Sequence, residues 1–191
     1  MSIQTTEFPT IAIVGFGALG ALFASLLAPQ LPFDKLRVIA DAKRVQRYQA
    51  EGLLVNATPV ALNYLTPTDC ATPADLVIVC TKFYQLEGVL PLIASQLGEN
   101  TIIISALNGI ASERRLAEAF GTDKVVYCVA QQMDARKEGN QLIYRDAGQL
   151  VIGAMTDNAD EIARVQRVDA IFNQVQFPHS IRDRKSTRLN S

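Results

Sequence analysis

The sequence lacks most of the residue patterns that mark extracellular or metal-binding proteins. Its 191 residues include no tryptophan, one histidine and three cysteines. Cys70, Cys80 and Cys128 are odd in number and widely spaced, so they suggest neither a disulfide framework nor a zinc site. We therefore expect a cytoplasmic protein without a metal centre.

Charge of either sign is also scarce. The 18 basic and 19 acidic residues give a formal net charge of -1, which provides no overall attraction to nucleic acid or to anionic lipid. One long uncharged stretch, between Glu7 and Asp34, has the apolar character of a short membrane span. No Lys or Arg precedes it, glycines interrupt it, and Pro29 and Pro32 close it, so we predict neither a signal peptide nor a membrane partner.

The sequence does contain enough apolar material for one well-packed domain. Hydrophobic residues make up 49% of the chain and charged residues 19%, which is typical of a compact globular protein. Strands are predicted at 11–14, 36–40, 75–80 and 101–105, helices at 18–28, 43–50, 84–97 and 112–120, and short extended pieces at 53–55 and 60–65. Short strands follow at 125–131, 141–145 and 150–152, then a helix at 158–173 and a last strand at 175–177. This order predicts a Rossmann fold, a doubly wound and mostly parallel α/β sheet that antiparallel strands extend at one edge.

A glycine-rich loop joins the first predicted strand to the first predicted helix. Its G-x-G-x-x-G pattern consists of Gly15, Phe16, Gly17, Ala18, Leu19 and Gly20. In this context Gly15 permits a tight turn, Gly17 lets the backbone approach a pyrophosphate, and Gly20 lets the helix pack closely on the strand. Free amides and the positive end of the helix dipole then face the phosphates, which predicts a bound nicotinamide dinucleotide. A methyltransferase that binds an adenosyl cofactor is the main alternative.

The choice between NAD and NADP depends on the residues after the second strand. Asp41 lies 21 residues beyond Gly20, where an acidic side chain usually binds the ribose hydroxyl of NAD. Lys43 and Arg44 follow, and either could contact the 2′-phosphate of NADP. Asp41 could equally cap the next helix, with both cations exposed to solvent. These residues leave the choice open.

Two polar residues follow the next two strands, at the sheet edge where ligands of open α/β sheets bind. Lys82 follows the strand at 75–80, and Asn108 follows the strand at 101–105. An ammonium and a carboxamide there could hydrogen-bond the nicotinamide ribose and a substrate carbonyl, which makes both residues catalytic candidates. Taken singly, each has a structural alternative, an exposed lysine at a helix start and an Asn-Gly turn.

Together these features resemble the ketopantoate reductase (2-dehydropantoate 2-reductase) family over nearly all of the first 183 residues. The resemblance is carried by the glycine loop, Cys80-Thr81-Lys82, Asn108-Gly109 before a helix with Glu113, and segment 135–140 before strands that end at Ile152-Gly153. The glycine loop alone is common to many dehydrogenases, whereas the four features in this order are much more specific.

The resemblance implies that NADPH contacts the glycine loop, Lys82, Asn108 and Ala135, and that Asn108 also touches the substrate. Where the family usually has an arginine for the 2′-phosphate, this sequence has Asp41, and Arg44 is the candidate substitute. We expect NADP as the cofactor, with NAD as the alternative.

The end of the chain departs from the family pattern. Family members continue into a helical second domain that supplies a proton-donating lysine, and at the expected place this chain has Arg188. We expect a dinucleotide-binding domain at 1–178 and the start of a second domain at 179–191, with the helical domain absent and 184–191 an artefactual tail. His179 is predicted to be a solvent-facing linker residue.

By this resemblance, the parent enzyme reduces a small 2-keto acid, ketopantoate, with NADPH in pantothenate synthesis. This chain is expected to supply the cofactor-binding half and to be inactive alone. Two other hypotheses are a dinucleotide-binding module without catalysis and another Rossmann dehydrogenase of a small oxo or hydroxy acid. The oligomeric state is left open.

Overall fold

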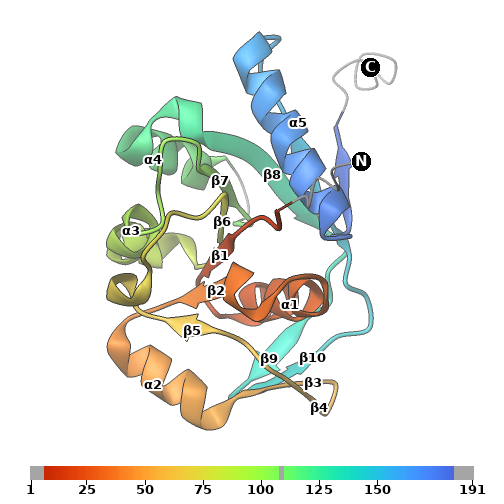
Figure 1. Ribbon diagram of the computed structural model, residues 1–191. Coiled ribbons are helices and arrows are strands. Elements are labelled where there is room, and N and C mark those ends of the chain that lie inside the picture. Colours follow the sequence, from red (N-terminus) through yellow and green to blue (C-terminus); the bar gives the residue numbers. More distant parts are fainter. Residues whose placement is uncertain (1–6, 108–109, 183–191) are drawn as a thin grey trace, which may run out of the picture.

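The computed structural model describes residues 7–107 and 110–182, in which one large sheet carries helices on both faces (Figure 1). In spatial order its eight strands are β12 (His179–Ile181), β11 (Gln149–Gly153), β8 (Val125–Gln131), β7 (Ile102–Ser105), β6 (Leu76–Val79), β1 (Ile11–Val14), β2 (Leu36–Ile39) and β5 (Tyr64–Leu65). Neighbouring strands are parallel except for the antiparallel pair β8 and β11. The predicted doubly wound, mostly parallel fold is confirmed.

The central strands are buried on both faces because helices cover each side. Side chains alternate along a strand, so Ile11 and Ile13 of β1 lie in one apolar core and Ala12 and Val14 lie in the other. The first core includes side chains of α1 (Ala18–Leu27), α2 (Ala42–Glu51) and α5 (Ala159–Gln174), and the second those of α3 (Leu86–Ala94) and α4 (Ala111–Phe120). Figure 1 shows α3 and α4 on one side of the sheet and α1 and α5 on the other.

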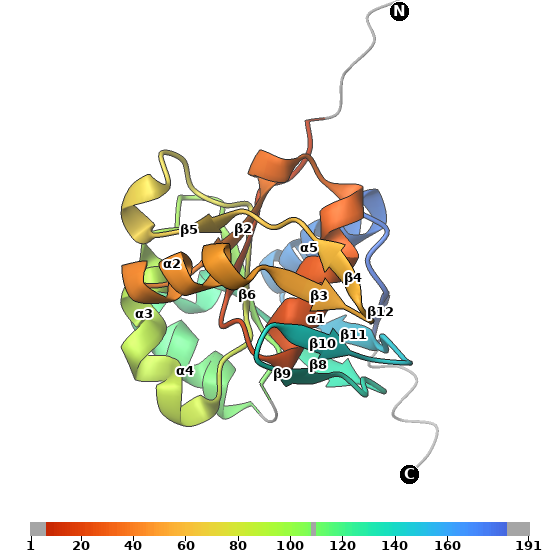
Figure 2. The same cartoon turned by 90° about the horizontal axis from the view of Figure 1, so that it is seen from below.

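A second, smaller sheet packs against α1 (Figure 2). Its order is β4 (Thr58–Val60), β3 (Leu53–Val55), β10 (Gln141–Ile143) and β9 (Arg136–Glu138). The strand predicted at 141–145 was expected to extend the main sheet, and that expectation is wrong. Its first three residues form β10, which pairs in parallel with β3, and Leu142 is fully buried in the core that contains α1.

The strand predicted at 175–177 is also misplaced. The last described strand is β12, which lies parallel to β11. Phe177 is buried and its ring stacks on that of Phe172 in α5 at 4.9 Å, so this apolar run serves the helix core. The start of a second domain at residue 179 stays a prediction, but residues 179–181 lie in the main sheet.

His179 is not the solvent-facing linker residue that the sequence predicts. Its side chain is 8% exposed, and its Nε2 atom lies 2.9 Å from Oδ1 of Asp169 in α5. Its Nδ1 atom lies 2.8 Å from the carbonyl oxygen of Phe177. The carboxylate partner lies ten residues away in sequence and is brought close by the turn after α5. The imidazole therefore ties β12 to α5.

The uncharged stretch between Glu7 and Asp34 is not one long helix. It contains β1, the glycine loop and α1, which is 10 residues long. Among the helices within 7–107 and 110–182, none has the length and apolar character needed to cross a bilayer.

Candidate functional site

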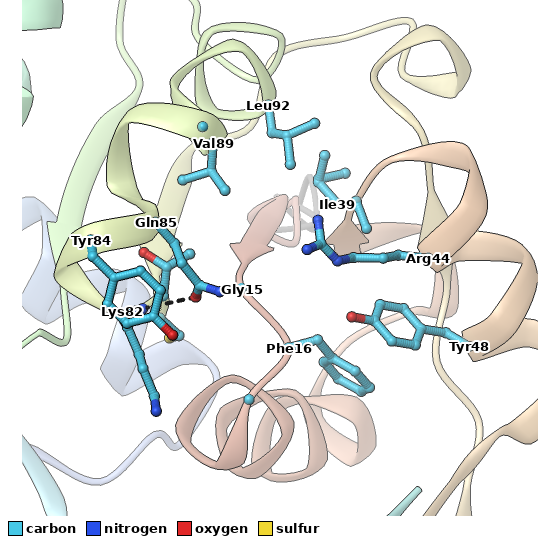
Figure 3. Close-up of a pocket in the computed structure, with 15 residues that line it drawn as sticks. Gly15, Phe16, Ile39, Arg44, Tyr48, Lys82, Tyr84, Gln85, Val89 and Leu92 are labelled. Carbon is cyan, nitrogen blue, oxygen red and sulfur yellow. Dashed lines mark hydrogen bonds between the residues drawn. The ribbon is translucent and has the colours of Figure 1, made fainter. Parts of the chain in front are cut away.

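The carboxyl ends of β1, β2 and β6 open onto a cleft of about 490 Å³. Three stretches of chain line it, namely the glycine loop, the end of β2 with the first two turns of α2, and the chain from Cys80 into α3. Figure 3 shows Arg44 and Tyr48 on one side, Lys82 and Tyr84 on the other, and Gly15 between them. The cleft therefore runs across the glycine loop from α2 to the segment after β6, which suits an elongated ligand.

The three glycines of the loop meet different surroundings. Gly15 has a φ of +99°, and a Cβ atom there would lie 2.7 Å from the carbonyl carbon of Cys80. A Cβ atom at Gly20 would collide with the carbonyl oxygen of Gly15. At Gly17, which lines the cleft, a Cβ atom would meet nothing within 4 Å. Gly15 and Gly20 are thus required by the fold, whereas Gly17 leaves open space for a ligand.

The first turn of α1 offers hydrogen-bond donors at this open space. Gly17 is the N-cap residue, no side chain caps the helix, and no acidic residue lies in the first turn. The positive end of the helix dipole is therefore uncompensated. Beside it, Oγ1 of Thr81 is buried and has no hydrogen-bond partner among the described residues, and Thr81 lines the same cleft. This donor set fits an anionic group such as a pyrophosphate.

Asp41 acts as the cap of α2, which confirms the structural alternative considered for it. Its Oδ1 atom accepts a hydrogen bond from the Arg44 amide at 2.9 Å, and its Oδ2 atom accepts one from Arg44 Nη1 at 2.7 Å. The bond from the Arg44 amide holds the pKa of the Asp41 carboxyl below its usual value. Asp41 lines a smaller hollow of about 340 Å³ with Lys43, Arg44 and Arg47, and Arg44 belongs to both cavities. A contact between Asp41 and a ribose stays a prediction.

The cleft brings together only part of the predicted binding set. Lys82 is exposed at the start of the turn Phe83–Gln85 and lines the cleft, and its amide donates to Oε1 of Gln85 at 3.4 Å. Ala135 lies elsewhere, just before β9 and partly buried against the core that contains α1. Asn108 lies outside the described residues. The predicted residues that line the cleft are Gly15, Phe16, Gly17, Arg44 and Lys82.

Sequence reasoning missed two aromatic lining residues. Tyr84 is 76% exposed and follows Lys82, so its place after a strand end was a usable signal. Tyr48 lies in α2, where its ring centroid is 5.0 Å from that of Phe16. No local pattern pairs α2 with the glycine loop, so this contact could not be predicted.

A buried carboxyl group lies beyond the cleft, in α4. Glu113 is 1% exposed, and its Oε2 atom accepts a hydrogen bond from Ser112 Oγ at 2.7 Å. Burial raises the pKa of Glu113. Together with Cys128 it lines a second cleft, of about 590 Å³, beside β8 and β11. Burial raises the pKa of the Cys128 thiol to about 12, so this thiol is not a thiolate nucleophile at neutral pH.

Comparison with known proteins agrees with this architecture. The family model "Ketopantoate reductase PanE/ApbA" matches residues 11–157. A 2-dehydropantoate 2-reductase of Aquifex aeolicus is 26% identical over 150 residues, which cover 78% of this chain and 48% of that protein. The chain thus spans about half the length of this relative.

Solved structures show the same fold. The crystal structure of 2-dehydropantoate 2-reductase from Geobacter metallireducens is 26% identical with a TM-score of 0.73, and covers 91% of this chain and 57% of that one. A D-mandelate dehydrogenase with NADH and anilino(oxo)acetate is 22% identical with a TM-score of 0.75, over 91% of this chain and 57% of that one.

Proposed function

The chain belongs to the ketopantoate reductase family, and we propose that it forms the dinucleotide-binding half of an NADPH-dependent 2-keto acid reductase. We propose ketopantoate as the substrate, with a role in pantothenate synthesis and a cytoplasmic location. The D-mandelate dehydrogenase neighbour makes another small oxo or hydroxy acid the alternative substrate. The observation that carries the proposal is the uncapped start of α1 beside the open space at Gly17.

The pyrophosphate is proposed to lie against the first turn of α1. Its oxygens would accept hydrogen bonds from the free amides there, and the dipole of α1 would favour their negative charge. Thr81 Oγ1, which has no partner among the described residues, would become a further donor. Gly17 would allow the close approach because it carries no Cβ atom.

The nicotinamide half is proposed to lie at the Lys82 side of the cleft, where NADPH supplies the hydride. The Lys82 ammonium would hydrogen-bond the nicotinamide ribose and polarise the substrate carbonyl. Asn108 and Ala135 remain proposed cofactor contacts, and Asn108 is also proposed to touch the substrate.

NADP is the proposed dinucleotide because Arg44 lines both the main cleft and the smaller hollow beside it. Its guanidinium would bind the 2′-phosphate. The Asp41 carboxylate, which is negatively charged like the phosphate, would repel it. Asp41→Asn should therefore raise NADPH affinity about threefold to tenfold over NADH affinity, because it removes a carboxylate but keeps an N-cap acceptor.

The test is a fluorescence titration of the chain with NADPH, NADH and an analogue of S-adenosylmethionine. We expect NADPH to bind more tightly than NADH, and the adenosyl analogue not to bind. Folded protein that binds the analogue but neither dinucleotide would overturn the proposal in favour of a methyltransferase. Tighter binding of NADH than of NADPH would overturn the choice of NADP alone.

A second candidate function is a dinucleotide-binding module without catalysis. It is favoured by the extent of the match with the Aquifex aeolicus relative, which covers 48% of that protein. The two candidates share the cofactor site and differ in turnover, so an assay of NADPH oxidation with ketopantoate separates them.

A further inference from the structure

Positive charge gathers at the α2 end of the main cleft. Lys43, Arg44 and Arg47 surround the hollow of about 340 Å³ that adjoins the cleft. Arg44 is paired with Asp41, so these two charges largely cancel. Within the described part of the chain, neither Lys43 nor Arg47 forms an ion pair. The hollow therefore has a surplus of positive charge.

A further cation comes from a distant part of the sequence. Lys137 lies in β9 of the small sheet, and its ammonium is 5.4 Å from the ring centroid of Phe16 in the glycine loop. The same ammonium donates to the carbonyl oxygen of Gly139 at 2.6 Å. The small sheet thus places a lysine over the loop that the proposed function assigns to the cofactor.

Two aromatic rings connect Lys137 with the cations of α2. The rings of Phe16 and Tyr48 lie 5.0 Å apart, and the guanidinium carbon of Arg47 is 5.2 Å from the Tyr48 ring centroid. Figure 3 shows Phe16, Tyr48 and Arg44 at the same end of the cleft. Arg47 and Lys137 therefore flank one aromatic surface that borders the cleft.

The positive charges of Arg47 and Lys137 are only partly compensated by the described residues around them. Burial and the positive charge of Arg47 lower the pKa of Lys137, which the carboxylate of Glu51 only partly offsets. Like Arg47, Lys137 forms no ion pair among the described residues. The contacts of these cations with the Tyr48 and Phe16 rings are attractive, but the two positive charges repel each other. A doubly charged phosphate would relieve this repulsion.

We propose that Arg47 and Lys137 bind the 2′-phosphate of the dinucleotide and so select NADP over NAD. This inference rests on the proposed dinucleotide function and adds two selectivity residues to it. These two cations would allow the chain to select NADP even though the Asp41 carboxylate follows β2. The aromatic surface of Phe16 and Tyr48 would lie against the adenosine that carries this phosphate.

The alternative is that Lys137 only holds the small sheet against the glycine loop. A structural contact of that kind would change the affinity of every adenine nucleotide to the same extent. A selectivity residue would affect only ligands with a 2′-phosphate. The pair 2′,5′-ADP and 5′-AMP separates the two roles because the ligands differ in that phosphate alone.

The experiment compares the binding of 2′,5′-ADP and 5′-AMP to the whole chain and to Lys137→Met and Arg47→Met. Each variant should weaken 2′,5′-ADP binding about tenfold and change 5′-AMP binding less than about twofold. Lys137→Arg, which keeps the charge, should retain most of the affinity for 2′,5′-ADP. Lys35→Met is the control, because Lys35 pairs with Glu7 at the opposite end of β2.

Equal effects on both ligands, or no effect on either, would overturn the selectivity role of these two residues. That result would leave the proposed function intact if the unmodified chain binds NADPH and NADH. If the folded, unmodified chain binds neither dinucleotide, the proposed function fails and this inference fails with it. Circular dichroism of each variant separates loss of binding from loss of fold.

Discussion

Gly17 and Gly20 offer a matched test of the loop at the scale of single residues. Gly20→Ala places a Cβ atom against the Gly15 carbonyl and should lower the free energy of unfolding by about 1–3 kcal/mol. Gly17→Val enters open space, so the free energy of unfolding should change by no more than about 1 kcal/mol. Its side chain would occupy the place of the pyrophosphate and should weaken NADPH binding more than about tenfold.

Urea unfolding and NADPH titration of both variants check this pair. If Gly17→Val retained full affinity, the first turn of α1 would not be the phosphate site. If Gly20→Ala were as stable as the unmodified chain, the close packing of α1 on β1 would not depend on this glycine.

Glu113 gives a prediction with a defined pH dependence. Burial raises its pKa above 4.5, so the folded chain keeps a proton that the unfolded chain releases. The contribution of Glu113 to stability should therefore fall as the pH rises above about 4.5 and level off above the folded-state pKa. Glu113→Gln lacks this loss and should gain stability relative to the unmodified chain between pH 4.5 and 7.5.

Urea unfolding across that pH range measures the difference. Glu118→Gln in the same helix is the matched control, because the Glu118 side chain is 71% exposed. A pH profile for Glu113→Gln that parallels that of the unmodified chain would contradict a raised pKa at Glu113.

Among whole elements, β12 depends on its contact with α5. His179→Ala removes the hydrogen bonds to Asp169 and to the Phe177 carbonyl, and should lower the free energy of unfolding by about 1–3 kcal/mol. The loss should be local, so amide exchange should quicken for Arg182, whose amide donates to Ile152, before it does in β1. Gln166→Ala, an exposed change on α5, is the control.

Uniform exchange along β1 and β12 in His179→Ala would contradict a local tether. Unchanged stability would mean that the imidazole adds little to the pairing of β12 with β11.

Local sequence patterns predict the elements whose structure depends mainly on their own residues and not on distant parts of the chain. The strands of the parallel sheet are short apolar runs, such as Leu76–Val79, which is buried throughout. The small sheet could not be predicted, because β10 pairs with β3 across more than 80 residues. At the site, the glycine loop has a local signature, whereas the approach of Lys137 to Phe16 requires the assembled small sheet.

At the scale of the whole molecule, the two clefts have different chemistry. The main cleft combines free amides, Arg44 and Lys82, which suits an anionic dinucleotide. The second cleft, beside β8 and β11, is bordered by exposed apolar side chains, among them Ile110, Val129 and Met155. The proposed cofactor site and this apolar surface therefore lie in separate clefts.

The last prediction is that the 191-residue chain binds NADPH but reduces ketopantoate at no appreciable rate. The chain spans 48% of the Aquifex aeolicus relative, so about half of that protein has no counterpart in these residues. General acid catalysis contributes about 10²- to 10⁴-fold, and substrate positioning contributes further, so loss of both should leave almost no turnover. Among the described residues that line the main cleft, Lys82 is the one lysine.

An assay of NADPH oxidation with ketopantoate, run beside the binding titration, checks this prediction. Turnover at about 1 s⁻¹ or faster would contradict it and would point to Lys82 as the proton donor. Lys82→Met should then abolish turnover while 2′,5′-ADP still binds, because that ligand has no nicotinamide half. If Lys82→Met left such turnover intact, the proton would have to come from a group outside this cleft, and the proposed role of Lys82 would be wrong.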